Sequence, residues 1–284
     1  MRRYLFPSFL GLLALSMAAY AGACWYLWVK QRELMFLPTR DVTRTPADVH
    51  LNYEDVRLPV GGKQPALLHG WWMQSNDADA AVVLYLHGND ANLGANVDHV
   101  AALHRIGFSV LAVDYRGYGK SEGAFPSESR MYDDAEAAWS YLVRERNVDR
   151  GQAFIYGHSL GGAVAIELAL RRPEAAGVVV ESAFTSMSDM AKIGYWMFPI
   201  DWLLNQRFDS LAKLPLLRVP VLFIHGMADA EVPYAMSERL FAAAPEPKWL
   251  TLIPGAGHED SASVGGALYT RAVLEFVQEN QRGR

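Results

Sequence analysis

The feature that most constrains the fold is residues 152–173, where an apolar run passes through a glycine-rich turn into a helical pattern. The segment reads QAFIYGHSLGGAVAIELALRRP, with Gly157 and Gly161 on either side of Ser159. Glycine leaves room for a sharp turn because it has no Cβ atom. A serine in such a strand–turn–helix lies at the carboxyl end of its strand, where the next helix directs its partly positive N-terminus. We therefore predict a sheet covered by helices, with Ser159 as a candidate nucleophile; a tight turn with a purely structural serine is the alternative.

Apolar runs like the one before Ser159 recur along the chain. We expect strands at residues 66–73, 82–86, 109–113, 153–156, 178–180, 221–224 and 250–253. Runs without polar alternation, such as AVVLYL and VPVLFI, are typical of strands buried on both faces, as in a parallel sheet covered by helices. Between most of these runs lie helical patterns, the clearest of which begins after Ser127. The repeated units predict one α/β domain from residue 52 to residue 284.

Residues 185–215 interrupt this rhythm. The segment is rich in Trp, Met, Phe and Leu, and it is longer than an ordinary connection between a strand and a helix. We expect a small helical lid insertion there, and one plain helix covering the sheet is the alternative.

The N-terminus carries 26 consecutive residues without a charge, from Tyr4 to Val29. About 20 apolar residues suffice for a helix to cross the hydrocarbon layer of a membrane. We therefore expect a single-pass membrane anchor over residues 1–32, followed by a Pro- and Thr-rich linker over residues 33–51. Basic residues flank both ends of the apolar run, so its orientation, and the side on which the catalytic domain lies, stay open.

Two other readings of the N-terminus remain. The stretch AYAGAC ends at Cys24 like a cleavage or lipid-attachment site, which would make the protein exported or lipid-anchored after cleavage. A buried globular helix is the third reading. The WYLWV run beyond Cys24 favours the anchor, because it keeps the segment apolar and places tryptophans near Lys30.

Composition excludes some classes of function. The net charge is −5, so a broad basic surface for nucleic acid is not expected. The chain has a single cysteine and no close His/Cys cluster in its sequence, so neither an internal disulfide nor a structural metal site is predicted.

A serine hydroxyl needs a histidine to accept its proton and a carboxylate to orient that histidine. Asp229 follows the apolar run at 221–224, and His258 follows the next one. Loops that leave the same edge of a parallel sheet converge, so Ser159, Asp229 and His258 are our candidate triad. The backbone N–H of Leu160, at the start of the helix after Ser159, can face a developing oxyanion. Glu181, which follows another strand, is an alternative orienting acid.

Over about residues 50–280 the chain resembles the α/β-hydrolase superfamily. The resemblance rests on LHGN, DYRGYGKSEG, GHSLGG, HGMAD and GAGH. The chain looks most like a membrane-anchored branch related to serine aminopeptidases and lipid-acting esterases. The resemblance implies the α/β-hydrolase fold and a second oxyanion donor at the backbone N–H of Asn89. Asp90 departs from the family pattern, because small apolar residues are more usual there, and a carboxylate near an oxyanion would oppose its charge.

These features predict a membrane-anchored serine hydrolase that cleaves carboxylic esters or thioesters of lipid or acyl substrates and needs no cofactor. A serine peptidase acting near peptide termini and a non-catalytic binding protein on the same fold are the alternatives. His158 and His225 are expected to be structural, and Asp114 to brace the loop with Arg116 and Tyr118. Oligomeric state stays open.

Overall fold

The computed structural model describes residues 5–62 and 65–281. Its centre is an eight-stranded sheet with the strand order β10-β9-β8-β7-β4-β6-β3-β2. The strands are β2 (Glu54–Val60), β3 (Ala66–Met73), β4 (Val82–Leu86), β6 (Ser109–Val113), β7 (Ala153–His158), β8 (Gly177–Glu181), β9 (Val221–Gly226) and β10 (Lys248–Ile253). Only β3 pairs antiparallel with its neighbours, β2 and β6, and the other pairs are parallel. The mostly parallel sheet predicted from the apolar runs is therefore confirmed.

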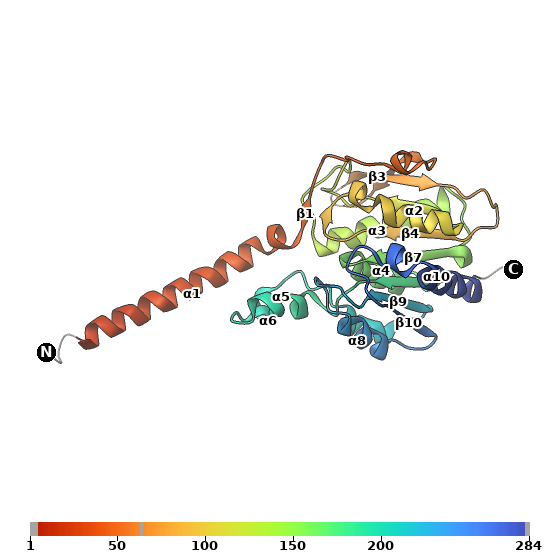
Figure 1. The fold of residues 1–284 in the computed structure, drawn as a ribbon. Helices are drawn as coiled ribbons and strands as arrows, with labels where there is room; N and C mark the ends of the chain where they lie inside the picture. The colour runs from red at the N-terminus through yellow and green to blue at the C-terminus, as the bar shows by residue number, and fades with distance from the viewer. Residues whose placement is uncertain (1–4, 63–64, 282–284) are drawn as a thin grey trace.

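Helices cover both faces of the sheet (Figure 1). The longer ones in the domain are α2 (Val97–Ile106), α3 (Glu128–Arg144), α4 (Leu160–Arg171), α8 (Ala235–Ala243) and α10 (Ala267–Asn280), with the short α9 (Ser261–Gly265) between β10 and α10. Short 3-10 helices, η1 (Pro46–Val49), η2 (Leu93–Asn96) and η3 (Arg150–Gln152), lie in the connections.

Alternate residues of the central strands enter two separate hydrophobic cores. On β4, Leu84 packs in the core beneath α3, α4 and α8, whereas Val83 packs in the core beneath α2 and α10. This division follows from the two-residue repeat of a strand, which sends neighbouring side chains to opposite faces. Both faces are apolar, so the strand runs show no polar alternation.

The region expected to form a lid lies between β8 and β9. It folds into α5 (Met187–Tyr195), α6 (Ile200–Leu203), α7 (Ser210–Lys213) and η4 (Leu214–Leu216). Ser186 caps α5 by accepting a hydrogen bond from the Asp189 N–H, yet α5 has no buried residue. The plain sheet-covering helix is therefore excluded. We call residues 185–215 the insertion.

The N-terminal helix α1 (Leu5–Met35) projects away from the domain (Figure 1). Within the described residues, the stretch Phe9–Met35 is the one helical segment long and apolar enough to cross a membrane. It ends at Met35 rather than at the predicted residue 32. The following strand β1 (Leu37–Pro38) pairs with β5 (Asp90–Ala91). The first part of the expected linker is therefore bound to the domain.

Candidate active site

Ser159 occupies a sharp turn between β7 and α4. Its backbone has φ 54° and ψ −122°, in the positive-φ region that L-residues rarely adopt. The Ser159 N–H donates to the carbonyl O of Glu181 at 2.8 Å, which fastens the turn to β8. A Cβ on Gly157 would lie 2.2 Å from the carbonyl O of Gly161, and one on Gly161 would lie 2.0 Å from that of Leu86. Only glycine fits at both positions, so the glycines of the motif are required by close backbone approach.

Asp229 and His258 meet beyond the carboxyl ends of β9 and β10. Nδ1 of His258 lies 2.7 Å from Oδ2 of Asp229, and both side chains are largely buried. These two strands are parallel neighbours, with Gly226 of β9 in register with Ile253 of β10. The adjacent strand ends therefore bring together two residues that are 29 positions apart in the sequence.

The carboxylate of Asp229 is held from several sides. Its Oδ1 accepts hydrogen bonds from the backbone N–H groups of Glu231 and Val232, each at 2.8 Å. Its Oδ2 also lies 3.1 Å from Nε2 of the buried His225. Burial opposes ionisation of Asp229, but these contacts with His225, His258 and Val232 outweigh it and hold the pKa of Asp229 well below its ordinary range. Asp229 is therefore an anion at neutral pH.

The same ion pair affects His258. Burial disfavours its protonated form, but the hydrogen bond and negative charge of Asp229 outweigh burial, so the pKa of His258 is raised. With Nδ1 turned to the carboxylate, Nε2 is the nitrogen left to exchange protons with a substrate or a nucleophile.

His158 connects the two halves of the site. It directly precedes Ser159, and its Nε2 lies 3.0 Å from the carbonyl O of His258, with the two rings 5.0 Å apart between centroids. The expectation that His158 is structural agrees with this contact. Its location adds a role that sequence reasoning missed, which is to tie the His258 loop to the Ser159 turn.

His225 also holds a neighbour of the site in place. Besides its contact with Asp229, its Nδ1 lies 2.6 Å from Oγ of Ser237 and its Nε2 2.9 Å from the carbonyl O of Val232. It is a satisfied core histidine, as expected, but it also positions the carboxylate. The contact between His225 and Asp229 depends on how the turn after β9 folds, so no local sequence pattern indicates it.

The loop after β4 lies against the nucleophile. A Cβ on Gly88 would be 3.3 Å from Cβ and 3.7 Å from Oγ of Ser159. Asn89 follows Gly88, and its carbonyl O accepts hydrogen bonds from the Tyr118 hydroxyl at 2.8 Å and from the Leu37 N–H at 3.0 Å. Leu160 is the first residue of α4, where N–H groups have no partner within the helix. The backbone N–H groups of Leu160 and Asn89 therefore belong to segments that border Ser159.

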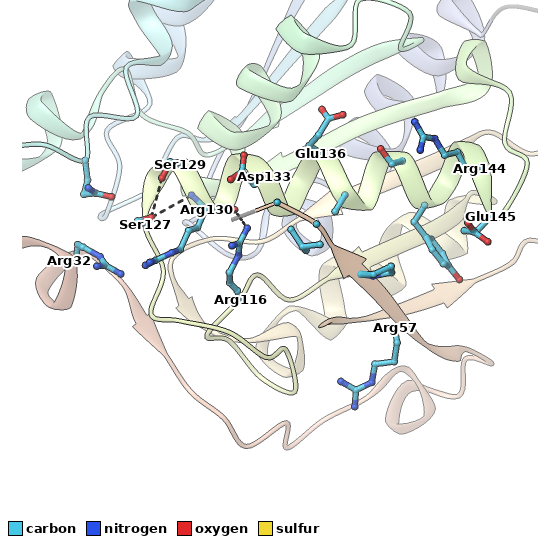
Figure 2. A pocket seen from close by; sticks show the side chains of 18 of the residues that line it. Arg32, Arg57, Arg116, Ser127, Ser129, Arg130, Asp133, Glu136, Arg144 and Glu145 are labelled. Carbon is cyan, nitrogen blue, oxygen red and sulfur yellow. Dashed lines mark hydrogen bonds between the residues drawn. The ribbon is translucent and has the colours of Figure 1, made fainter. Parts of the chain in front are cut away.

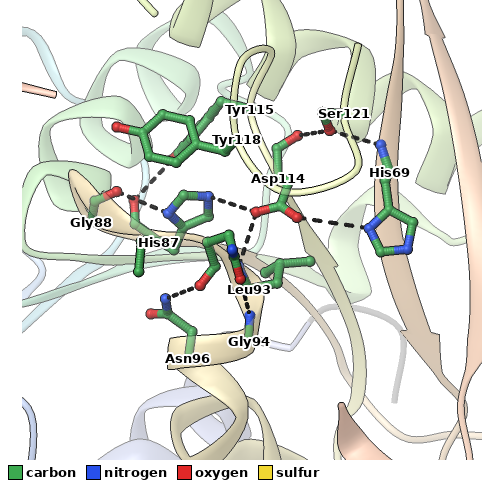
Figure 3. Close-up of polar contacts among 12 residues, drawn as sticks. His69, His87, Gly88, Leu93, Gly94, Asn96, Asp114, Tyr115, Tyr118 and Ser121 are labelled. Atoms are coloured by element: carbon green, nitrogen blue, oxygen red, sulfur yellow. Dashed lines mark hydrogen bonds and ion pairs between the residues drawn. The ribbon is translucent and has the colours of Figure 1, made fainter. Parts of the chain in front are cut away.

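A buried polar network holds the loop after β4 in place (Figure 3). The carboxylate of Asp114 lies 3.4 Å from Nε2 of His87 and 3.7 Å from Nδ1 of His69, and it accepts a hydrogen bond from the Leu93 N–H at 2.9 Å. Burial opposes ionisation of Asp114, but its contacts with His69, His87 and Leu93 lower its pKa.

The prediction that Asp114 braces its own loop agrees with the structure, and the structure adds a second role for its carboxylate. Its carboxylate holds the segments after β4, while Arg116 is held instead by Asp134, with Nε and Oδ1 2.7 Å apart. The backbone carbonyl of Asp114 does brace its own loop, because it accepts a hydrogen bond from Ser121 Oγ at 2.6 Å. The sequence could not indicate the side-chain partners of Asp114 and Arg116, because they come from separate elements of the fold.

Asp90, the departure from the family pattern, is exposed to solvent. Its Oδ1 accepts a hydrogen bond from the N–H of Ala91 at 2.7 Å. Its charge is thus bound by the neighbouring backbone and screened by water, which weakens its effect on a nearby oxyanion.

Glu181, the alternative orienting acid, belongs to a different network. Its Oε2 accepts a hydrogen bond from the Tyr156 hydroxyl at 2.5 Å, and that hydroxyl lies 2.8 Å from the hydroxyl of Tyr269. These groups lie in the interior between β7, β8 and α10. The geometry favours Asp229 over Glu181 as the partner of His258.

Among the residues that the structure describes, one group of side chains could hold a metal ion. Single ligand atoms of His99, His158 and Glu259 lie within 4.8 Å of one another. Burial lowers the pKa of His99 to about 3, so its imidazole is neutral. Sequence reasoning missed this group, because His99 comes from α2 and stands in no motif.

A large surface hollow lies away from these residues. A groove of about 1290 Å³ runs along α3 and the end of β2 (Figure 2). Charges of both signs line it, including those of Arg57, Asp133, Glu136 and Arg144. None of the candidate triad or oxyanion residues is among the described residues that line it, so the groove is separate from the candidate active site.

The chain is similar in sequence and in fold to several known proteins. A family model described as serine aminopeptidase, S33, matches residues 77–213. The chain is 35% identical to the uncharacterized protein Rv2307c of Mycobacterium tuberculosis over 260 residues, which cover 91% of each chain. It is 27% identical to the α/β hydrolase domain-containing protein WAV2 of Arabidopsis thaliana, over 88% of each chain. Among solved structures, the Pyrococcus furiosus esterase Pf2001 superposes with a TM-score of 0.70 at 23% identity, covering 87% of this chain and 98% of that one.

Proposed function

This chain belongs to the α/β-hydrolase superfamily, and we propose that it is a membrane-anchored serine hydrolase that cleaves carboxylic esters or thioesters. The observation that carries the proposal is the 2.7 Å contact between His258 Nδ1 and Asp229 Oδ2, tied through His158 to the strained turn at Ser159. A buried imidazole–carboxylate pair, held by a contact with His158 to the turn that carries the serine, is suited to proton transfer during acyl transfer.

In the proposed reaction, Ser159 Oγ attacks the acyl carbonyl carbon while its proton passes to Nε2 of His258. Asp229 stabilises the imidazolium that forms, and the backbone N–H groups of Leu160 and Asn89 donate to the oxyanion. The tetrahedral intermediate then expels the alcohol or thiol, which takes the proton from His258. Water repeats the sequence on the acyl-enzyme, again with His258 as base, and releases the acid.

The anchor in this proposal is α1. Its length and apolar composition are compatible with a membrane span, and many of its large apolar side chains are not covered by the domain. We propose that the domain stays at the membrane through this helix, with lipid or acyl substrates reaching it there.

The matched family model favours a second candidate, cleavage of peptides near their N-terminus. The same acyl-enzyme chemistry would serve an amide, with an amine as leaving group. The preference therefore depends on substrate binding rather than on the catalytic groups.

A substrate panel tests the proposal. Purified full-length protein is assayed in detergent with p-nitrophenyl esters of graded length, an acyl-thioester and an aminoacyl amide, each beside Ser159→Ala. We expect ester or thioester hydrolysis that the variant lacks. Turnover of the amide alone would select the peptidase, and no turnover above Ser159→Ala on any substrate would favour a non-catalytic binding protein.

A further inference from the structure

The insertion exposes a group of large apolar side chains to solvent. They are Ile193, Tyr195, Trp196, Met197 and Trp202, and among them Trp196 is 75% and Trp202 88% exposed. Large apolar side chains exposed together in one short segment are typical of an interaction site with protein or membrane. Tryptophan and tyrosine in particular gather at the level of lipid headgroups.

This surface lies alongside α1. The Tyr20 hydroxyl donates to the carbonyl O of Met197 at 2.8 Å, and the Tyr20 ring stacks on Phe198 with centroids 5.5 Å apart. Closer to the domain, Gln31 accepts a hydrogen bond from the Asn205 N–H at 2.8 Å. The insertion is thus attached to the apolar helix at two levels, which agrees with the placement of α5 and α6 near α1 in Figure 1.

The length of α1 determines how deep these contacts lie in a membrane that the helix spans. Its 31 residues rise about 46 Å, whereas the hydrocarbon layer is about 30 Å thick. When the hydrocarbon layer begins at Phe9, where the apolar stretch starts, about 20 residues cross it, and Tyr20 lies within the layer. Its partners Met197 and Phe198 then lie in the leaflet nearest the domain.

An apolar pocket separates α1 from the insertion. It has a volume of about 230 Å³, and its walls include Leu27, Leu34 and Met35 of α1 and Met190, Ala191 and Leu203 of the insertion. Its inner end borders the catalytic loop, because the carbonyl O of Met35 accepts a hydrogen bond from Nδ2 of Asn89 at 2.8 Å. An apolar pocket of this kind suits a hydrocarbon chain, because removing methylene groups from water is favourable.

We infer that the insertion dips into the membrane leaflet beside α1 and that the pocket between them takes the acyl chain of a membrane lipid. The occupant is a lipid in the bilayer rather than a free ester, because the pocket and the exposed aromatic side chains lie beside the helix that would cross that bilayer. This inference rests on the proposed function for the identity of the bond that is cleaved, but the location of the insertion does not depend on catalysis.

The location is tested in the full-length protein, reconstituted in phosphatidylcholine nanodiscs, with Cys24→Ser as background. Met197→Cys is labelled with an environment-sensitive fluorophore. Asp79→Cys is the control, because Asp79 is exposed and its carbonyl O accepts a hydrogen bond from Nε2 of Gln281. Gln281 follows α10, which lies on the side of the domain remote from α1 (Figure 1). We expect lipids with a quencher on the acyl chain to quench the label at 197 at least twofold more than the label at 79. Equal quenching would overturn the inference.

The pocket is tested by filling it. Ala191→Phe places a ring in the pocket, whereas Gly194→Phe adds the same ring on the same helix where a Cβ meets no atom within 4 Å. We expect Ala191→Phe to lower the ratio of kcat/KM for a long-chain ester in vesicles to that for p-nitrophenyl acetate by roughly tenfold, with the ratio retained in Gly194→Phe. An unchanged ratio in both variants would overturn the inference.

The two experiments separate this inference from the proposed function. If the wild type hydrolyses p-nitrophenyl acetate but neither the quenching nor the ratio behaves as expected, the inference alone fails. If the label at 197 is quenched and no ester is cleaved, the proposed function fails while the location of the insertion stands.

Discussion

His258 Nδ1 lies 2.7 Å from Oδ2 of Asp229, and this contact joins the loops after two neighbouring parallel strands. Burial of both groups makes the pair electrostatically strong. Because the contact raises the pKa of His258 and lowers that of Asp229, it makes the pH dependence of activity a direct probe of the site.

The base must be neutral to accept the proton of Ser159, so activity is lost as His258 becomes protonated. The ordinary pKa of histidine is near 6.5, and that of His258 is raised. We expect kcat/KM to rise with pH through a single ionisation with a midpoint above 6.5, measured with a neutral ester. A midpoint below 6.5 would contradict the pairing with Asp229.

Replacing the acid tests which carboxylate orients His258. Asp229→Asn should lower kcat by roughly 10⁴-fold, the effect of losing the orienting acid in such a triad, and should move the pH midpoint downward. Glu181→Gln is the matched comparison, because Glu181 is also buried at this sheet edge but bonds to Tyr156. A larger loss of activity from Glu181→Gln would reverse the assignment.

The loop after β4, which contains Asn89, can be loosened by a substitution outside the candidate triad. Tyr118→Phe removes the hydroxyl that donates to the carbonyl O of Asn89 at 2.8 Å. We expect kcat to fall roughly tenfold, because the oxyanion donor is less well positioned, while the free energy of unfolding falls by only about 1 kcal/mol. Denaturant melts give the second value, and a kcat equal to that of the wild type would argue against Asn89 as a donor.

The polar network under this loop should contribute to stability. Asp114→Ala leaves the Leu93 N–H without its acceptor in a buried site, and we expect a loss of about 1–3 kcal/mol in the free energy of unfolding. Asp55→Ala removes another partner of His69, but Asp55 is half exposed, so the expected loss is about 0–1 kcal/mol. Equal losses in the two variants would show that burial does not decide their contributions.

Most of the sheet could be predicted because strands buried on both faces leave continuous apolar runs. Each predicted run matches a strand to within a few residues, as at residues 66–73, 82–86 and 109–113. Strand β2 was missed. Its sequence, EDVRLPV, has exposed charged residues and a proline, and it pairs only with β3 at the edge of the sheet.

In the candidate active site, too, some residues could be predicted from the sequence and others could not. Ser159, Asp229 and His258 could be proposed because each follows a recognisable strand, and they stay a prediction until chemistry tests them. The supporting contacts of His158, His225 and Tyr118 could not be proposed, because each joins segments whose distance depends on the folded loops. The contact between Tyr20 and Met197 spans 177 positions and was likewise beyond any local pattern.

The central claim is that Ser159 is a nucleophile activated by His258. The most direct measurement is covalent labelling of the folded full-length protein with a fluorophosphonate, followed by mass spectrometry of its peptides. We predict one adduct per chain at Ser159, labelled much more slowly in His258→Ala and absent in Ser159→Ala. Equal labelling of the wild type and Ser159→Ala, or no labelling of the folded wild type, would contradict this claim.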